Sequence, residues 1–308
     1  MLNFKIKTHD KVGEMLNVTI IGAGSIGLLV AAKLAMNGQV VTVVCRRKNQ
    51  ADQLRKGINY INRDKTECVN VQATHHLSSK KTDLLIVAVK SNQVPSVVSL
   101  IQEVYQDSNL PDILFIQNGM GHLSYIELLH HNVLVGVVEH GAMKIDESTV
   151  EHTGDGIIRM SAYSGVPNLV TALSSEDFPV CYEHDWYEML AKKLVVNCAI
   201  NPLSSIYRVL NGELLQNARF YSLMRELVKE ACEVLELEFE RSWNDVQLVC
   251  RKTSANTSSM LADLKAGRLT EIDAITGYVL KEAEARGKHV PFSRFVFDSV
   301  KGLEMVTR

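Results

Sequence analysis

The sequence predicts an α/β protein in which a doubly wound parallel sheet domain is followed by an all-helical second domain. Short apolar runs alternate with helical patterns through the first half of the chain, and a glycine-rich turn follows the first of these runs. From Trp186 onward the apolar residues recur mainly with a helical period. Strands that are apolar on both faces belong in a parallel sheet covered by helices, and a length of 308 residues suits two domains.

The first half supplies the elements of the sheet. NVTIIG reads as a buried strand, and the helix after it is closed by Gly38. A further helix is expected between two of the later strands. The expected strands are residues 17–22, 40–45, 83–90, 112–119 and 133–138, and the expected helices are residues 25–38 and 93–105.

The pattern changes after Val138. Residues 148–164 predict an antiparallel hairpin that turns at Gly154-Asp155-Gly156, and the stretch from Gly165 to about Asp185 is the candidate linker. Helices are then expected over 220–238, from the capping Thr270 to Gly287, and from Pro291 onward.

The chain accordingly divides into an N-terminal extension (1–14), a dinucleotide-type sheet domain (15–180) and a helical substrate and catalytic domain (181–308). The extension is polar throughout and is no signal peptide, and Met15 would be a natural start. The apolar run around residues 19–33 is too short and too rich in glycine to span a membrane.

Composition excludes several classes of function. A net charge of −2 argues against a nucleic-acid surface. The six cysteines form no C-x-x-C pair and stand in apolar runs, so we expect buried free thiols and a reducing, cytoplasmic compartment. The pairs His75-His76 and His130-His131 lack carboxylate or cysteine support, so no metal site is predicted.

Gly22-Ala23-Gly24-Ser25-Ile26-Gly27 matches G-x-G-x-x-G between a strand and a helix. In such Rossmann-type turns Gly22 permits the turn, Gly24 admits a pyrophosphate, and Gly27 lets helix and strand pack closely. The end of the next strand carries Arg46, Arg47 and Lys48, where NAD enzymes usually place an acidic residue. Guanidinium groups pair well with the 2′-phosphate of NADP, so the motif and its neighbours predict NADP (as NADPH).

Two strand ends carry polar side chains. VAVK ends in Lys90, and IQNG places Asn118 at the end of another strand. Ligands in such folds lie beyond the carboxyl ends of the strands, so both residues are expected to point toward one crevice. A lysine reaching solvent and an ordinary Asn-Gly turn are the alternatives.

KKLVVNCAINPLSS places Lys193, Asn197 and Asn201 at steps of four, on one face of an apolar helix. Such groups are costly in apolar surroundings unless partnered. The alternatives are a snorkelling lysine, a satisfied core amide and a helix terminator. Pro202 disfavours the α conformation at Asn201, so the helix is expected to end or kink there.

VKSNQV, QNGMG, KLVVNCAINPLS and SSMLADLKAGRLTEID follow GAGSIG in this order, and together they resemble the ketopantoate reductase (2-dehydropantoate 2-reductase) family from about Met15 to the C-terminus. The resemblance implies NADPH-dependent reduction of ketopantoate to pantoate, in the pathway to pantothenate and coenzyme A. It implies a catalytic lysine at Lys193, with Asn197, Asn201 and Ser259 binding the substrate.

The resemblance also implies that Asn118 contacts cofactor and substrate, and that Lys90 and Gln93 lie by the ribose and phosphate of the cofactor. It implies that Glu271 lies near the nicotinamide ribose and helps to order the closed site, and that Asp263 is a further acidic residue of the cleft. Ser258 and Ser259 could instead cap a helix, and Glu271 could complement a helix N-terminus.

Three hypotheses remain open. The first is the ketopantoate reductase, and a variant of it reduces another branched 2-keto acid. The second is a dehydrogenase of the 3-hydroxyacid or glycerol-phosphate type, and the third is a non-catalytic NADP sensor. His140 is the rival of Lys193 as general acid. A small-molecule substrate is the expected partner, and a homodimer is an option that such helical domains often take.

Overall fold

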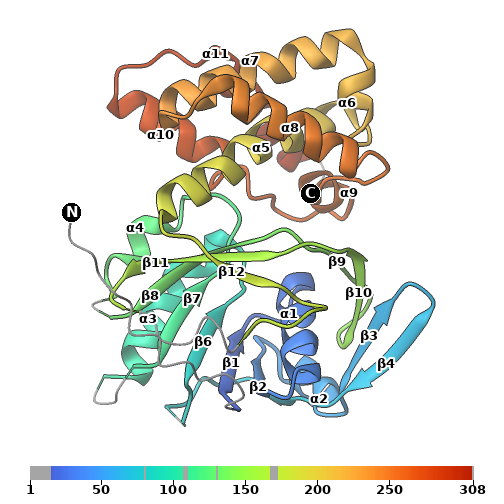
Figure 1. Ribbon diagram of the computed structural model, residues 1–308, viewed down its shortest axis with the longest axis vertical. Helices are drawn as coiled ribbons and strands as arrows, with labels where there is room; N and C mark the ends of the chain where they lie inside the picture. The colour runs from blue at the N-terminus through green and yellow to red at the C-terminus, as the bar shows by residue number, and fades with distance from the viewer. Residues whose placement is uncertain (1–14, 80, 107–109, 130, 167–172, 307–308) are drawn as a thin grey trace. The chain divides into compact units, whose positions relative to one another are not determined.

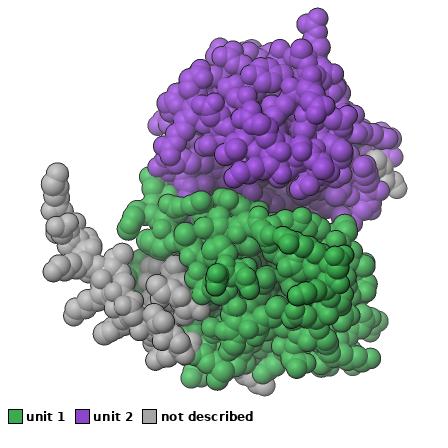
Figure 2. Space-filling view, turned by 45° about the vertical axis from the view of Figure 1, so that its right-hand side comes forward, with its two compact units in different colours: residues 1–89, 93–117, 125–186 green, residues 90–92, 118–124, 187–308 purple. Residues whose placement is uncertain are grey.

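The computed structural model describes residues 15–306 except 80, 107–109, 130 and 167–172 (Figure 1). The predicted extension 1–14 therefore lies outside the described residues, as does part of the predicted linker. The chain forms two compact units. Unit 1 contains the residues up to 89, 93–117 and 125–186, and unit 2 contains 90–92, 118–124 and 187–308 (Figure 2).

Unit 1 is built on an eight-stranded sheet, which confirms the predicted doubly wound α/β fold. Its strand order is β12-β11-β8-β7-β6-β1-β2-β5. The pairs from β8 through β7, β6, β1 and β2 to β5 are parallel, whereas β11 runs antiparallel to β8. The strands are β1 (Asn17–Ile21), β2 (Val40–Val44), β5 (Gln72–Thr74), β6 (Leu84–Val87), β7 (Asp112–Phe115), β8 (Val133–Val138), β11 (Ile158–Ser164) and β12 (Val180–Tyr182).

The helices of unit 1 follow the strands as the apolar pattern predicts. Helix α1 (Ser25–Met36) is buried nearly all round, because it packs against β1 and β2 of the large sheet and also against a second sheet. Gly38 follows it with φ +82°, as expected for the residue that closes a helix. The other helices of unit 1 are α2 (Lys48–Leu54) and α3 (Val94–Val104), whereas the short 3₁₀ turn η1 (Ser91–Gln93) and α4 (Leu123–Ile126) are each divided between the two units.

The predicted hairpin over 148–164 is wrong. Its two halves form β10 (Thr149–Gly154) and β11, which lie in different sheets. Strand β10 pairs with β9 (Gly141–Lys144) and with β3 (Ile58–Asn62), which in turn pairs with β4 (Lys65–Val69). The strand and turn signals were correct, but each strand finds its partners elsewhere in the chain.

Unit 2 is helical, as predicted. Helices α7, α10 and α11 pack against one another, and α6, α7 and α8 form a second set of contacts. The long α5 runs through Pro202 to Tyr207, so the helix does not end at Asn201, and the alternative expectation of a kink there stays a prediction. The helices are α5 (Trp186–Tyr207), α6 (Glu213–Gln216), α7 (Ala218–Leu235), α8 (Phe239–Lys252), α9 (Ser259–Lys265), α10 (Thr276–Ala285) and α11 (Pro291–Val306).

Helix α10 begins six positions after the predicted Thr270, and residues between them form turns. The hydroxyl of Thr270 does accept a hydrogen bond from Ile272 N (3.2 Å), so it closes a turn instead of capping a helix. Gly287 ends α10 with φ +62°, and α11 starts at Pro291, both as expected.

The division of the chain differs in detail from the predicted one. A boundary between 180 and 181 would cut β12, which pairs with β11, whereas the compact units part between Trp186 and Tyr187. Two strand-end segments, 90–92 and 118–124, belong to unit 2. The domain limits of the prediction therefore remain a prediction.

Cys45, Cys198, Cys232 and Cys250 are buried free thiols, as expected, but Cys68 and Cys181 are exposed. Cys68 lies in β4 and Cys181 lies in β12. The apolar pattern of the sequence did not indicate which face of these two strands is exposed. Among the described helices, none combines the length and the apolarity needed to cross a bilayer.

Candidate active site

The glycine-rich turn in unit 1 has the geometry that a dinucleotide needs. Gly22 has φ +116°, and a Cβ there would lie 2.8 Å from the Ala88 carbonyl carbon. A Cβ at Gly27 would lie 2.0 Å from Gly22 O, so glycine is required for the close packing of α1 on the turn. A Cβ at Gly24 meets nothing within 4 Å, which leaves the backbone open on that side.

Helix α1 leaves its N-terminal amides available. Its N-cap Gly24 has no side chain to satisfy them, and its first turn contains no acidic residue. Unsatisfied N–H groups and the helix dipole together favour a phosphate at this position. The residues present therefore fit the pyrophosphate of a dinucleotide.

The two arginines of the basic cluster after β2 differ in their contacts. Arg47 forms an ion pair with Glu147 (2.5 Å), and Lys144 contacts the same carboxylate (3.1 Å). Arg46 is exposed, and within the described part of the chain it has no hydrogen-bond or ion-pair partner. Gln50 connects this corner to the glycine-rich turn, because its Nε2 donates to both Ala23 O and Glu147 O (3.0 Å each).

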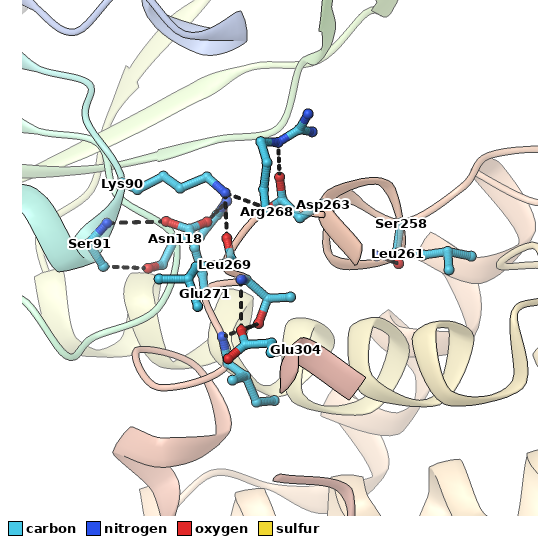
Figure 3. Close-up of polar contacts among 12 residues, drawn as sticks. Lys90, Ser91, Asn118, Ser258, Leu261, Asp263, Arg268, Leu269, Glu271 and Glu304 are labelled. Carbon is cyan, nitrogen blue, oxygen red and sulfur yellow. Dashed lines mark hydrogen bonds and ion pairs between the residues drawn. The ribbon is translucent and has the colours of Figure 1, made fainter. Parts of the chain in front are cut away.

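Two strand ends meet a turn of the helical unit. Asn118 Nδ2 donates to Glu271 Oε2 (3.0 Å), and the Ser91 amide donates to Glu271 Oε1 (3.3 Å). The Ser91 hydroxyl in turn donates to Asn118 O (3.3 Å). Figure 3 shows these three residues directed toward one another. The structure thus brings together Asn118, which the resemblance assigned to both cofactor and substrate, and Glu271, which it assigned to the nicotinamide ribose.

Burial raises the pKa of Glu271 above its ordinary value. The hydrogen bonds from Asn118 and Ser91 and the charge of Lys90 act in the opposite direction, without cancelling the effect of burial. A half-buried carboxyl that is held by two N–H donors and has a raised pKa is unusual outside functional sites, so Glu271 is a strong candidate for a functional residue.

Lys90 is paired inside unit 2. Its Nζ lies 2.7 Å from Asp263 Oδ2 and donates to Leu269 O (2.8 Å). Asp263 also contacts Arg268 Nε (2.9 Å), so one carboxylate holds two cations (Figure 3). Lys90 and Asp263 were both expected at the site, and the structure adds that they form an ion pair with each other.

The polar face of α5 is present as predicted. Lys193, Asn197 and Asn201 stand on successive turns of one uninterrupted helix. Asn197 and Asn201 are buried, whereas Lys193 is half-buried. Asn197 Nδ2 is a buried donor that has no hydrogen-bond partner among the described residues, as expected of an amide that binds a ligand.

The two serines before α9 have separate roles. Ser258 caps the helix, because its Oγ accepts from Leu261 N (3.2 Å), and it also accepts from Ser204 Oγ on α5 (2.7 Å). Ser259 is exposed and is the first residue of α9, so its hydroxyl is not used for the cap. Gln93 is exposed at the start of α3, in unit 1.

His140 is part of a buried network in unit 1. Its Nδ1 accepts from Gly156 N and lies 3.1 Å from His152 Nε2, and its ring stacks on Phe178. The pKa of His140 is lowered to about 4, mainly by burial and to a smaller extent by the nearby His152 and Lys33. An imidazole that is uncharged near neutral pH is a weak general acid, which argues against His140 as the rival of Lys193.

The sequence did not point to three polar groups around Glu271. Ser91 offers its backbone amide, Leu269 offers its carbonyl, and Glu304 in α11 accepts from both Thr270 N and Thr270 Oγ1. Backbone groups have no sequence signature. Glu304 is a buried acidic residue on an otherwise amphipathic helix, a signal that becomes readable only when its burial is known.

The family description "Ketopantoate reductase PanE/ApbA" matches residues 18–165, and "Ketopantoate reductase PanE/ApbA C terminal" matches residues 185–304. A 2-dehydropantoate 2-reductase of Bacillus subtilis is 41% identical over 300 residues, which cover 95% of this chain and 99% of that protein. One from Listeria monocytogenes is 35% identical over 95% of this chain and 98% of that protein.

Solved structures agree with these relatives. The crystal structure of a probable 2-dehydropantoate 2-reductase from Bacillus subtilis has a TM-score of 0.84, with 41% identity and coverage of 94% of this chain and 100% of that one. A D-mandelate dehydrogenase with NADH and anilino(oxo)acetate has a TM-score of 0.87 at 21% identity, over 95% and 99% of the two chains, and shows only that the fold is shared. The resemblance predicted from the motifs is confirmed, and the chain belongs to the ketopantoate reductase family.

Proposed function

We propose that the chain reduces the 2-keto group of ketopantoate (2-dehydropantoate) to the hydroxyl of pantoate with NADPH, a step toward pantothenate and coenzyme A. The observation that carries this proposal is the 41% identity to a 2-dehydropantoate 2-reductase along almost the whole of both chains. Each unit also supports it by itself, because unit 1 contains a dinucleotide turn and basic residues after β2, and unit 2 contains a lysine-amide face on α5.

When bound, NADPH supplies a hydride to the keto carbon of the substrate. The keto oxygen then becomes an alkoxide, and the reaction is complete when this oxygen has gained a proton. Lys193 is assigned to that oxygen, because an ammonium group supplies both the charge that stabilises an alkoxide and the proton that neutralises it. The products are pantoate and NADP⁺, with the Lys193 amine left to take up a proton from solvent.

The remaining polar groups bind and orient. Asn197 and Asn201 offer neutral amides to the hydroxyl and carboxylate of the substrate, and the exposed Ser259 hydroxyl joins them at the carboxylate. Asn118 and Glu271 hold each other and are assigned to the nicotinamide ribose end of the cofactor. Lys90 and Gln93 are assigned to its ribose and phosphate portion, with Asp263 as the counter-charge of Lys90.

Within the basic cluster, Arg46 is the residue we assign to the 2′-phosphate. Arg47 already has a carboxylate partner in Glu147, whereas Arg46 has none among the described residues. Pairing with the phosphate would therefore cost Arg46 no existing ion pair, and for Arg47 it would mean sharing or breaking one.

Oligomeric state and location complete the proposal. A solved relative at 20% identity is a dimeric ketopantoate reductase from Staphylococcus aureus, and we propose a homodimer here as well. A cytoplasmic location is consistent with six free cysteines.

The proposal is tested by following the absorbance of NADPH with a panel of 2-keto acids. Ketopantoate should be turned over with the highest kcat/KM of the panel. A higher kcat/KM for another branched 2-keto acid would reassign the substrate and keep the chemistry. Binding of NADPH without turnover of any member would identify a sensor and contradict the proposed function.

A further inference from the structure

Glu304, near the end of α11, is one of the few buried carboxylates in unit 2, with 4% of its surface exposed. Its Oε1 accepts from Thr270 N (2.8 Å) and Thr270 Oγ1 (2.7 Å), and its Oε2 contacts Lys301 Nζ (3.0 Å). Burial acts against ionisation, but the hydrogen bonds from Thr270 and the charge of Lys301 outweigh it, and the pKa of Glu304 is lowered. Glu304 is therefore a charged acceptor, which makes the strongest kind of hydrogen bond to an amide.

Thr270 connects Glu304 by hydrogen bonds to the residues on either side of Glu271. Its hydroxyl donates to Glu304 and accepts from Ile272 N (3.2 Å), so the residues immediately before and after Glu271 are both held. On the other side of the turn, Glu271 O accepts from Ala274 N and Ile275 N (3.0 Å each). The Glu271 side chain is left facing Asn118 and Ser91 (Figure 3).

The same turn also fixes the segment that contains Asn118. Ala274 O accepts from Met120 N (3.0 Å) and Gly121 N (3.3 Å), and Leu269 O accepts from Lys90 Nζ (2.8 Å). A Cβ at Gly119 would lie 2.2 Å from Ala274 O, so the two backbones touch. Any displacement of the turn would thus move Glu271, Lys90 and the Asn118 segment together.

We propose that Glu304 and Thr270 are positioning residues for the reaction, which hold the 269–275 turn so that Glu271 meets Asn118 and Lys90 keeps its carbonyl partner. They act through other residues and touch neither substrate nor cofactor. This inference rests on the proposed function, since it names residues that orient the same site.

Unit 2 contains a matched control at the other end of α11. Glu230 is buried to a similar extent (8% exposed) and accepts from Phe292 N (2.9 Å), Ser293 N (2.7 Å) and Ser293 Oγ (2.7 Å). Like Glu304, it is a buried carboxylate that accepts from backbone N–H and one hydroxyl, but it has two amide donors where Glu304 has one amide and Lys301. The residues that it holds are not among the candidate site residues.

The test compares Glu304→Gln, Thr270→Val, Thr270→Ser and Glu230→Gln with the parent. Glutamine would present N–H toward Lys301 or Thr270, and valine removes the Thr270 hydroxyl at nearly constant volume. Each variant is measured for Tm, NADPH affinity, and kcat and KM for ketopantoate below the lowest Tm. We expect Glu304→Gln and Thr270→Val to lower kcat by roughly 10- to 100-fold, the scale of a small misplacement of catalytic groups, with Thr270→Ser near the parent.

Glu230→Gln should lower Tm and leave kcat within about twofold of the parent. If Glu304→Gln instead lowers Tm as Glu230→Gln does and leaves kcat unchanged, Glu304 is only structural and the inference is wrong. Amide hydrogen exchange gives a reading that does not depend on turnover. Met120 and Gly121 should lose protection in Glu304→Gln and Thr270→Val but not in Glu230→Gln, and unchanged protection would contradict the inference even in a parent that reduces no 2-keto acid.

Discussion

Asn118 Nδ2 and Glu271 Oε2 are joined by a 3.0 Å hydrogen bond across 153 positions of the sequence. Asn118 lies in the loop that follows β7, and Glu271 lies before α10. Neither is explained by the packing of a core, because both are polar and Glu271 is desolvated at a cost to its charge. We interpret the pair as the part of the site that holds the ribose end of the cofactor.

The pKa of Glu271 predicts a pH dependence of stability. Burial raises the folded-state pKa above 4.5, so the folded protein binds this proton more tightly than the unfolded chain. The associated stability is fully present below pH 4.5 and is lost as the pH rises through the folded pKa. The free energy of unfolding of the parent, minus that of Glu271→Gln, should therefore fall over this window in denaturant titrations. A difference that stays constant or rises would contradict the raised pKa.

Arg46→Ala should weaken NADPH binding more than NADH binding. Loss of a charge-assisted phosphate contact costs on the order of 1.5–3 kcal/mol, roughly 10- to 100-fold in Kd. Arg47→Ala should have a smaller effect, because Arg47 is already paired with Glu147, and Lys48→Ala is the control for loss of one exposed positive charge. Fluorescence titrations with NADPH and with NADH give the ratio of the two Kd values for each variant. A parent that binds NADH more tightly than NADPH would overturn the assignment of Arg46 to the 2′-phosphate.

Asn201→Ala and Ser259→Ala should raise KM for the keto acid and leave the Kd for NADPH nearly unchanged. Both side chains are assigned to the substrate alone, and loss of a hydrogen bond costs about 0.5–1.5 kcal/mol for a neutral acceptor and about 1.5–3 kcal/mol for a carboxylate. Ser258→Ala is a useful contrast, because Ser258 caps α9 and should affect Tm more than KM. A large loss of cofactor affinity with an unchanged KM would place Asn201 and Ser259 on the wrong ligand.

The sequence predicted those parts of the fold that local patterns determine. The strands β1, β2, β6 and β7 are apolar on both faces, and Gly38 and Gly287 end their helices where expected. The pairing of β10 could not be predicted, because a turn signal at Gly154 indicates that the chain bends and not which strand lies beside it. The expected end of the helix at Asn201 failed for a related reason. A proline disfavours the α conformation of the residue before it, but α5 remains helical through Pro202 in the packed protein.

The residues of the candidate site also divide into those that local spacing predicts and those that only tertiary packing brings together. The glycine turn and the Lys193 face were predictable because their spacing has a direct geometric meaning. The partner of Lys90 is Asp263, at a separation of 173 positions, and that of Thr270 is Glu304. Such pairs are created by tertiary packing, so only the family resemblance could bring residues such as Asp263 and Glu271 to attention.

The central claim is that Lys193 stabilises and protonates the developing alkoxide. Removing one such electrostatic donor typically costs roughly 10²–10³-fold in rate, and an interaction made mainly in the transition state appears in kcat as well as in kcat/KM. Lys193→Ala should thus bind NADPH almost normally, and Lys193→Arg should not restore the rate, because a guanidinium does not release a proton near neutral pH.

The most direct measurement is single-turnover oxidation of bound NADPH by saturating ketopantoate, in the parent, Lys193→Ala and His140→Gln. We predict a rate at least about 100-fold lower for Lys193→Ala and a rate within a few-fold of the parent for folded His140→Gln. A Lys193→Ala variant that reacts within a few-fold of the parent, while His140→Gln does not, would contradict the mechanism and return the role of general acid to His140.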